Sequence, residues 1–218
     1  GSDLNLSPLF SSNGLVGYWK FDEGQGTSTQ DSSGNGNTGT LSASPPSWVS
    51  GKVGDALQFN GSTNNVSIPS FNYESNQQYT IVGWINDDGS SQASWISKES
   101  SWSDGFKFWG VFSAYYFRVG DGTNAQSLWS NYNTGISNNQ WVYLVITRNG
   151  SAWSMYLNGQ FNSSIANATI GNTNLGGPLE IGARLLGPWY FKGTIDDVRI
   201  YDRALSAAEI MALYNATR

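Results

Sequence analysis

Histidine and cysteine are both absent from this chain of 218 residues, and each absence removes whole classes of chemistry. Without histidine, Ser-His-Asp and Cys-His catalytic sites are excluded, because their general base is missing. Zinc sites built from imidazole and thiolate ligands are excluded as well, and the lack of cysteine rules out a disulfide framework. A bound metal would therefore be a hard cation held by oxygen atoms, such as calcium.

Charged residues are scarce too, at 12% of the chain, where an average domain has roughly 25%. The net charge is −5 and the 11 basic residues are scattered, so we expect no nucleic-acid partner. No apolar run approaches the ~20 residues of a membrane-spanning helix, so we expect no membrane insertion. Gly1 and Ser2 are typical of cloning residues, and we expect a fragment of a longer secreted or cell-surface protein.

Glycine and aromatic residues are abundant instead, with 26 Gly, 10 Trp, 11 Tyr and 10 Phe. Many short strands joined by Gly, Asn and Ser turns give this composition. Alternating or β-branched patterns predict strands at residues 15–21, 56–59, 65–68, 79–85, 94–97, 106–112, 115–119, 140–147, 151–157, 179–182 and 193–201. A single helix is expected after Ser206, which forms a capping-box pattern with Glu209 and precedes the apolar face of Ile210, Leu213 and Tyr214.

Several of these segments resemble, in their order, the bacterial LamG-like jelly-roll family of the concanavalin-A-like superfamily. The resemblance is carried by Leu-Val-Gly-Tyr-Trp-Lys-Phe-Asp-Glu-Gly at 15–24, by the Gly/Asn-rich stretch 31–41, and by the closing segment 193–206 with its helix. It implies an all-β jelly-roll sandwich of two antiparallel sheets with a short C-terminal helix. We expect residues 1–13 to be a tag remnant and linker, and residues 14–218 to form the domain. Family members often carry histidine beside the equivalent of Trp141, whereas Val142 and Tyr143 stand here.

Residues 22–40 contain almost no large apolar side chain, so they cannot pack a core and must form a long loop, either ordered or disordered. Their carboxylate and amide oxygens are ligands that calcium accepts. The resemblance places the first and last strands side by side, which implies a structural calcium ion between this loop and the last strand. The implied ligands are Asp22, Asp31, Asn37 and Asp196. In the alternative interpretation, these side chains only cap turns and bind their own backbone.

Aromatic residues exceed what one core needs. Alternation assigns Trp19, Phe21, Phe59, Trp84, Val142, Leu144 and Ile146 to the core. Five others stand in polar or turn-rich contexts and are candidate ligand contacts, namely Trp102, Trp129, Tyr132, Trp189 and Tyr190. Exposed rings stack on the C–H faces of sugars while neighbouring polar groups bind the hydroxyls. The alternative is that these rings fold back over the sandwich or pack under their loops.

Catalytic residues are not expected. Glycan hydrolysis needs two carboxyl groups about 5–5.5 Å or about 6.5–9.5 Å apart, and the Glu-x-Asp-x-(x)-Glu strand of concanavalin-A-like glucanases is missing. We therefore predict a non-catalytic carbohydrate-binding, lectin-like module of an extracellular or cell-surface protein, with a glycan or polysaccharide as partner. Because this fold also hosts other roles, an adhesion or structural module that binds a surface protein or acts as a spacer stays open.

Overall fold

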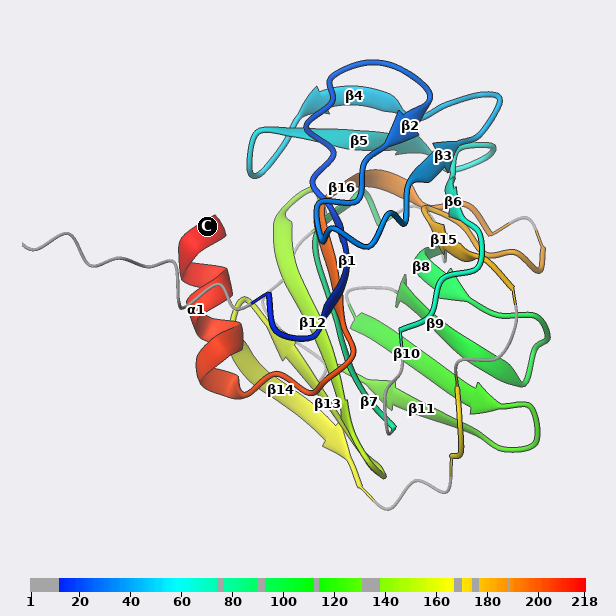
Figure 1. Cartoon of the computed structure of the whole chain (residues 1–218), viewed down its shortest axis with the longest axis vertical. Helices are drawn as coiled ribbons and strands as arrows, with labels where there is room; N and C mark the ends of the chain where they lie inside the picture. Colours follow the sequence, from blue (N-terminus) through cyan, green and yellow to red (C-terminus); the bar gives the residue numbers. More distant parts are fainter. Residues whose placement is uncertain are drawn as a thin grey trace, which may run out of the picture.

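Two antiparallel β-sheets face each other in the computed structural model (Figure 1). The structure describes residues 12–73, 77–89, 93–111, 114–130, 138–166, 170–173, 177–187 and 189–218, apart from the side chains of Trp109 and Val111. Most of the linker predicted at residues 1–13 therefore lies outside the described residues, as does Tyr132.

The first sheet, called sheet A, has the strand order β14-β13-β12-β7-β16-β5-β4, with β1 also paired to β16. Its strands are β1 (Leu15–Trp19), β4 (Ser47–Ser50), β5 (Asp55–Asn60), β7 (Gln78–Asp87), β12 (Trp141–Asn149), β13 (Ala152–Leu157), β14 (Gln160–Ile165) and β16 (Lys192–Tyr201). The pairing of β1 with β16 confirms that the first and last strands lie side by side.

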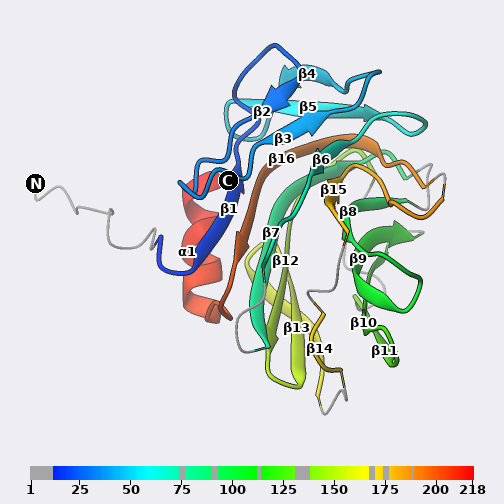
Figure 2. The ribbon, with the colours of Figure 1, turned by 45° about the vertical axis from the view of Figure 1, so that its right-hand side comes forward.

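The second sheet, called sheet B, has the order β11-β10-β9-β8-β15-β6-β3-β2. Its strands are β2 (Ser28–Thr29), β3 (Gly39–Leu41), β6 (Val66–Ile68), β8 (Ser94–Lys98), β9 (Asp104–Val111), β10 (Ala114–Asp121), β11 (Ala125–Trp129) and β15 (Leu179–Ile181). Figure 2 shows sheet B facing one side of sheet A, while α1 (Ala207–Thr217) lies on the other side.

Apolar side chains fill the space between the sheets because side chains alternate between the two faces of a strand, except at irregularities such as the register shift in β8, where Trp95 and Ile96 both enter the core. In β12, Val142, Leu144 and Ile146 belong to this core, as the alternation predicts. Tyr143 and Val145 point the other way, into a second cluster beneath α1. Sheet A is thus buried on both faces over part of its area, which explains the continuous apolar run of β12.

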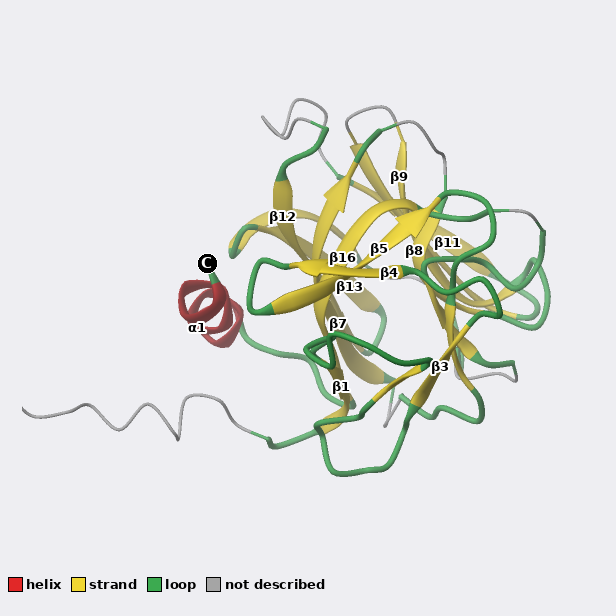
Figure 3. Cartoon of the chain, turned by 90° about the horizontal axis from the view of Figure 1, so that it is seen from above, coloured by secondary structure: helices red, strands yellow, loops and turns green. Residues whose placement is uncertain are grey.

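Trp84 is buried as predicted, but it belongs to the cluster beneath the helix and not to the core between the sheets. Its indole N–H donates to the Thr217 hydroxyl at 3.0 Å. The helix itself begins as the sequence predicts, because the Ser206 and Glu209 side chains each accept the other residue's backbone N–H. Viewed from above in Figure 3, the helix lies against the outside of the sandwich.

Residues 22–40 are ordered by polar contacts, and they are not loop throughout, because they contain β2 and the start of β3. Glu23 Oε1 accepts the Gln30 N–H at 2.7 Å and the Thr29 hydroxyl at 3.1 Å. The Trp19 indole donates to the Asn37 carbonyl at 2.8 Å. Hydrogen bonds therefore replace the apolar packing that this segment lacks.

Candidate functional site

The outer face of sheet B presents side chains from β10 and β11 to solvent. On β10, Tyr115, Phe117 and Val119 belong to the core, so the intervening Tyr116 and Arg118 point outward. The register pairs Tyr116 with Trp129 and Arg118 with Ser127 on β11. Aromatic and cationic side chains therefore stand two residues apart on the same outer face.

Trp129 is 44% exposed, and its ring centroid lies 4.3 Å from that of Tyr116. The Tyr116 hydroxyl and Ser127 Oγ share a hydrogen bond of 2.6 Å, which fixes the tyrosine ring under the tryptophan. Tyr116 also pairs in register with Trp109 of β9, and Trp109 pairs with Ser94. A bridge then joins Ser94 to Tyr190, so the backbone aligns Trp129 and Tyr190 across one row of the sheet.

A polar row runs beside the aromatic one. Its members are paired in register in the order Ser67, Glu180, Ser97, Lys107, Arg118 and Ser127. Glu180 is held by the Ser67 hydroxyl at 2.7 Å and by the Asn65 amide at 2.6 Å. Arg118 is only partly buried and forms no ion pair with any carboxylate of the described residues. Its guanidinium is therefore available to a ligand.

Lys107 of this polar row belongs to a buried ion cluster, called the Glu99 cluster, together with Glu99 and Arg184. The carboxylate is fully buried, pairs with the Lys107 ammonium, and accepts Arg184 Nε and Nη2, each at 2.8 Å. Burial lowers the pKa of Lys107, and the Glu99 carboxylate opposes that effect. Because isolated buried charges are costly, the three side chains depend on one another.

Trp102 covers the Glu99 cluster and is itself exposed. The Arg184 guanidinium lies 4.2 Å from the centroid of its ring, and Lys107 Nζ lies 6.0 Å from it. Trp102 remains 59% exposed, so it does not pack under its loop. Arg184 also donates its backbone N–H to the Trp189 carbonyl at 3.2 Å, and Trp189 is 40% exposed. One arginine thus positions two of the predicted aromatic contacts.

Four of the five predicted aromatic residues lie in the described part of the chain, and all four border the outer face of sheet B or its loops. Tyr190 is partly buried, whereas Trp102, Trp129 and Trp189 are exposed. Sequence reasoning missed Tyr116 and Arg118. The alternation of apolar residues at 115, 117 and 119 could have placed both on the outer face.

Two of the four residues predicted to bind calcium, Asp31 and Asn37, lie together in the N-terminal loop. Asp31 accepts backbone N–H groups from Tyr18 and Ser33 at 2.9 Å and from Asn37 at 3.0 Å. Burial would raise the pKa of Asp31, but these hydrogen bonds outweigh it and lower that pKa. The Asn37 amide donates to the Val16 carbonyl at 2.8 Å. The Asp31 carboxylate is thus already engaged in folding its own loop.

Asp22 and Asp196 meet at the hairpin between β4 and β5. Asp196 Oδ2 accepts the N–H groups of Lys52 and Val53, both at 2.8 Å, and Asp22 Oδ1 accepts the Asp55 N–H at 2.9 Å. Gly54 has a φ of +69°, and a Cβ there would lie 2.2 Å from Asp22 Oδ1, so only glycine fits.

Asp196 has the feature that best fits a cation. Its side chain is fully buried, and Oδ1 has no hydrogen-bond partner. Burial, with the neighbouring Asp197 and Asp22 carboxylates, raises the pKa of Asp196 to about 7. No group of three or more Asp and Glu side chains is placed to hold a metal within the described ranges. A calcium ion beside Asp196 would therefore need backbone carbonyls and water as further ligands.

Comparison with models of protein families identifies the family of this chain. The model described as the concanavalin A-like lectin/glucanases superfamily matches residues 60–211. The chain belongs to this superfamily. Comparison with curated proteins gave no match. No helix in the described part of this superfamily member is long and apolar enough to cross a membrane.

Solved structures of superfamily-like domains show the same fold. The binding domain of Paraclostridial Mosquitocidal Protein 1 has a TM-score of 0.78 and 18% identity, over 94% of this chain and 52% of that one. Domain 4 of AbnA, a GH43 extracellular arabinanase from Geobacillus stearothermophilus in complex with arabinotriose, has a TM-score of 0.73 and 22% identity, over 92% and 98%.

A third similar structure is the botulinum neurotoxin serotype D ligand binding domain in complex with N-acetylneuraminic acid. Its TM-score is 0.72 with 17% identity, over 94% of this chain and 51% of that one. The chain thus spans about half the length of these toxin domains and nearly all of the arabinanase domain. At sequence identities of 17–22%, the structural similarity to these domains shows the fold alone.

Proposed function

We propose that this chain is a non-catalytic glycan-binding module whose binding surface is the outer face of sheet B. The observation that carries the proposal is the exposed Trp129 ring seated on Tyr116, with the unpaired Arg118 two residues further along the strand. The flat indole offers a stacking surface for a sugar ring. The guanidinium offers paired donors for hydroxyl or carboxylate oxygens.

Trp102 extends this surface beyond the strands. It borders Lys107, which pairs in register with Arg118, so the loop tryptophan and the strand arginine flank the same lysine. The Glu99 cluster beneath holds Trp102 by cation–π contact, which limits the entropy that the ring loses when a ligand binds. A pre-formed surface of this kind suits a module that binds without changing shape.

The similar structures support a binding role without naming the ligand. One is described with arabinotriose and another with N-acetylneuraminic acid, and the arabinanase is described as extracellular. We accordingly propose an extracellular or cell-surface location for the protein that contains this domain.

We propose that the module is not catalytic because two of its glutamates, Glu99 and Glu180, are buried and already bound to other side chains. Glu99 is fully buried between two cations, and Glu180 is buried and hydrogen-bonded to Asn65 and Ser67. Glu99 is thus screened from a substrate by its own partners, and Glu180 has neutral partners and no described acidic residue beside it in its row.

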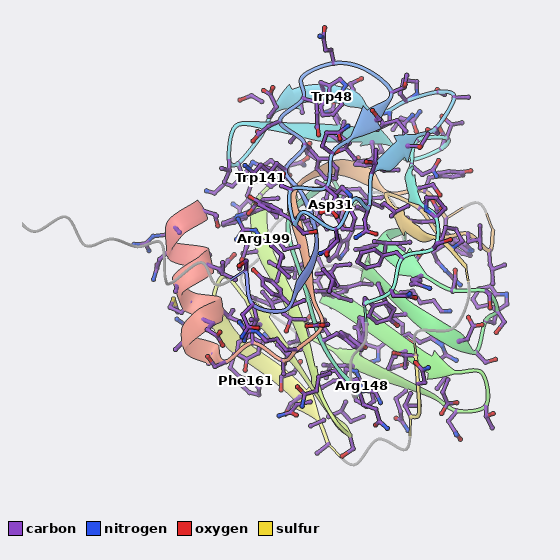
Figure 4. All side chains as sticks on the ribbon, viewed as in Figure 1. Asp31, Trp48, Trp141, Arg148, Phe161 and Arg199 are labelled. Atoms are coloured by element: carbon purple, nitrogen blue, oxygen red, sulfur yellow. The ribbon has the colours of Figure 1, made fainter. Side chains whose placement is uncertain are left out.

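Replacing Trp129 or Trp102 by alanine is expected to weaken glycan binding by about 10-fold or more without lowering the melting temperature, because stacking anchors dominate such interfaces. Phe161→Ala is the matched control, since Phe161, labelled in Figure 4, is as exposed as Trp102 at 59% but packs on Tyr156 of sheet A. A glycan array followed by isothermal titration with each hit measures the effect.

Equal affinity in the tryptophan variants and the wild type would place the glycan site elsewhere. If folded wild-type protein bound no glycan on the array, the glycan proposal would be wrong. An adhesion or spacer module would then take its place.

We also propose a structural calcium ion beside Asp196, with Asp22 at the same hairpin. Support comes from the buried, unpartnered Oδ1 of Asp196 and from the raised pKa that burial imposes on it. A cation would compensate this charge and tie the hairpin to the last strand. Thermal melting with calcium and with EDTA tests the proposal.

A further inference from the structure

A groove of about 510 Å³ lies on the outer face of sheet A, on the opposite side of the sandwich from Trp129. Its floor is a row of polar side chains that the register places on adjacent strands, namely Ser47 of β4, Gln58 of β5, Thr194 of β16 and Asn86 of β7. These residues point outward because Leu57, Phe59, Ile85 and Ile195 beside them belong to the core.

The row ends at an aromatic residue. Asn86 pairs in register with Trp141 of β12, which lies next to the groove's lining, packs against the cluster beneath α1 and keeps part of its surface exposed (Figure 4). Adjacent strands in a sheet are about 4.8 Å apart, so the row offers polar contacts at regular intervals with a ring at one end. A linear chain of sugar rings presents hydroxyls in a comparable repeating pattern.

Hydrogen-bonding capacity in this row is unused within the described residues. The side chains of Gln58, Asn86 and Thr194 donate to and accept from none of the described protein groups. By contrast, Asn64 at the rim is engaged, because its oxygen accepts the Asn60 N–H and its amide donates to the Ser44 carbonyl. The floor thus keeps amide donors and acceptors available for a ligand.

The charged residues that line the groove cancel each other, which favours a neutral ligand. Its charged lining residues, Lys192 and Asp88, form an ion pair at 3.0 Å and neutralise each other. A peptide is disfavoured because the backbone groups of β5, β16 and β7 already pair within the sheet, and the edge strand β4 has only four residues, of which Ser47 alone lines the groove, so there is little edge for β-augmentation. Phe59 is the apolar residue of the lining, so there is little to anchor an apolar side chain.

We propose that this groove is a second glycan-binding site, specific for a segment of a linear neutral oligosaccharide. Gln58, Asn86 and Thr194 contact its hydroxyls, and Trp141 stacks on a terminal ring. The site is independent of the sheet B face, so a chain that uses both faces is bivalent toward polysaccharide. Bivalency raises the apparent affinity for a repeating polymer without any new contact.

The test is a nuclear magnetic resonance titration of ¹⁵N-labelled protein with cellohexaose, xylohexaose, maltohexaose and arabinohexaose as probes. The side-chain amide signals of Gln58 and Asn86 are expected to shift with at least one probe. The shifts should persist in the Trp102→Ala/Trp129→Ala protein, which lacks the anchors of the other face.

A Gln58→Ala/Asn86→Ala variant is expected to raise the Kd of that probe at least 10-fold. Gln160→Ala, an exposed amide on β14 outside the groove, should leave it unchanged. The inference is overturned if no probe at millimolar concentration moves the Gln58 and Asn86 signals. It is equally overturned if the shifts vanish in the Trp102→Ala/Trp129→Ala protein, since a single site would then explain all binding.

Discussion

Glu99→Gln is expected to lower the free energy of unfolding by about 3–5 kcal/mol, the usual effect of removing one partner from a buried ion cluster. Glutamine has nearly the same shape, so the loss comes from charge and not from a cavity. Lys107 and Arg184 are 1% and 7% exposed, and without the carboxylate both cations would stay buried beside each other. Urea denaturation followed by tryptophan fluorescence measures the change.

Glu180→Gln provides the matched control for this prediction. Glu180 is also buried, at 5% exposure, but its partners Ser67 and Asn65 are uncharged. Burial raises the pKa of Glu180, so losing its charge removes an unfavourable term and the variant should remain close to wild type. If the two variants were equally stable, the Glu99 cluster would not have the structural importance assigned to it.

Asp196→Asn is expected to stabilise the domain at pH 8 in EDTA buffer. The native carboxyl keeps its proton up to about pH 7, whereas an unfolded aspartate loses it near its ordinary value of 3.8. Between these pH values the native state binds the additional proton, so native stability falls as pH rises. Each pKa unit corresponds to about 1.4 kcal/mol, which makes the effect on the order of a few kcal/mol.

Asparagine keeps an oxygen that accepts the Lys52 and Val53 N–H groups, so the hairpin contacts survive the substitution. Burial also raises the pKa of Asp87, to about 6. This makes the stability of both proteins fall with pH to the same extent, so the difference between the two proteins reports Asp196 alone. Melting temperatures from pH 5 to 8 should therefore fall more steeply for wild type than for the variant.

Added calcium at pH 8 should raise the melting temperature of wild type and leave that of Asp196→Asn unchanged, because the asparagine lacks the charge. A calcium response of the same size in both proteins would argue against an ion at Asp196. Parallel pH curves would argue against the raised pKa itself.

Much of the fold follows from local patterns that the sequence displays. The Ser206–Glu209 capping box and the alternation of Val142, Leu144 and Ile146 are confirmed. The adjacency of the first and last strands, which the family resemblance implies, is confirmed too. The strands β2, β3 and β4 were missed because two to four residues give too little alternation to be recognised. The strands β11 and β14 were missed as well, because their residues are mostly polar and resemble a loop. Hydrogen bonds that the Glu23 and Asp31 carboxylates accept order the region around them, and sequence spacing does not reveal such contacts.

The candidate site was also predictable only where local sequence context indicates exposure. Trp102 and Trp129 stand among polar residues, and both are exposed. Arg184 is 85 positions from Glu99, so nothing local indicates that this buried pair would support Trp102. Tyr116 and Arg118 alternate with the core residues Tyr115, Phe117 and Val119, and the apolar character of that strand masks its outward face.

The location of the glycan site is tested most directly by the indole N–H signals of the tryptophans, followed by nuclear magnetic resonance while a glycan-array hit is added. We predict that the signals of Trp102 and Trp129 shift, while those of the fully buried Trp19 and Trp153 do not. Binding that left the Trp102 and Trp129 signals unmoved would contradict the assignment of the sheet B face as the primary glycan-binding surface.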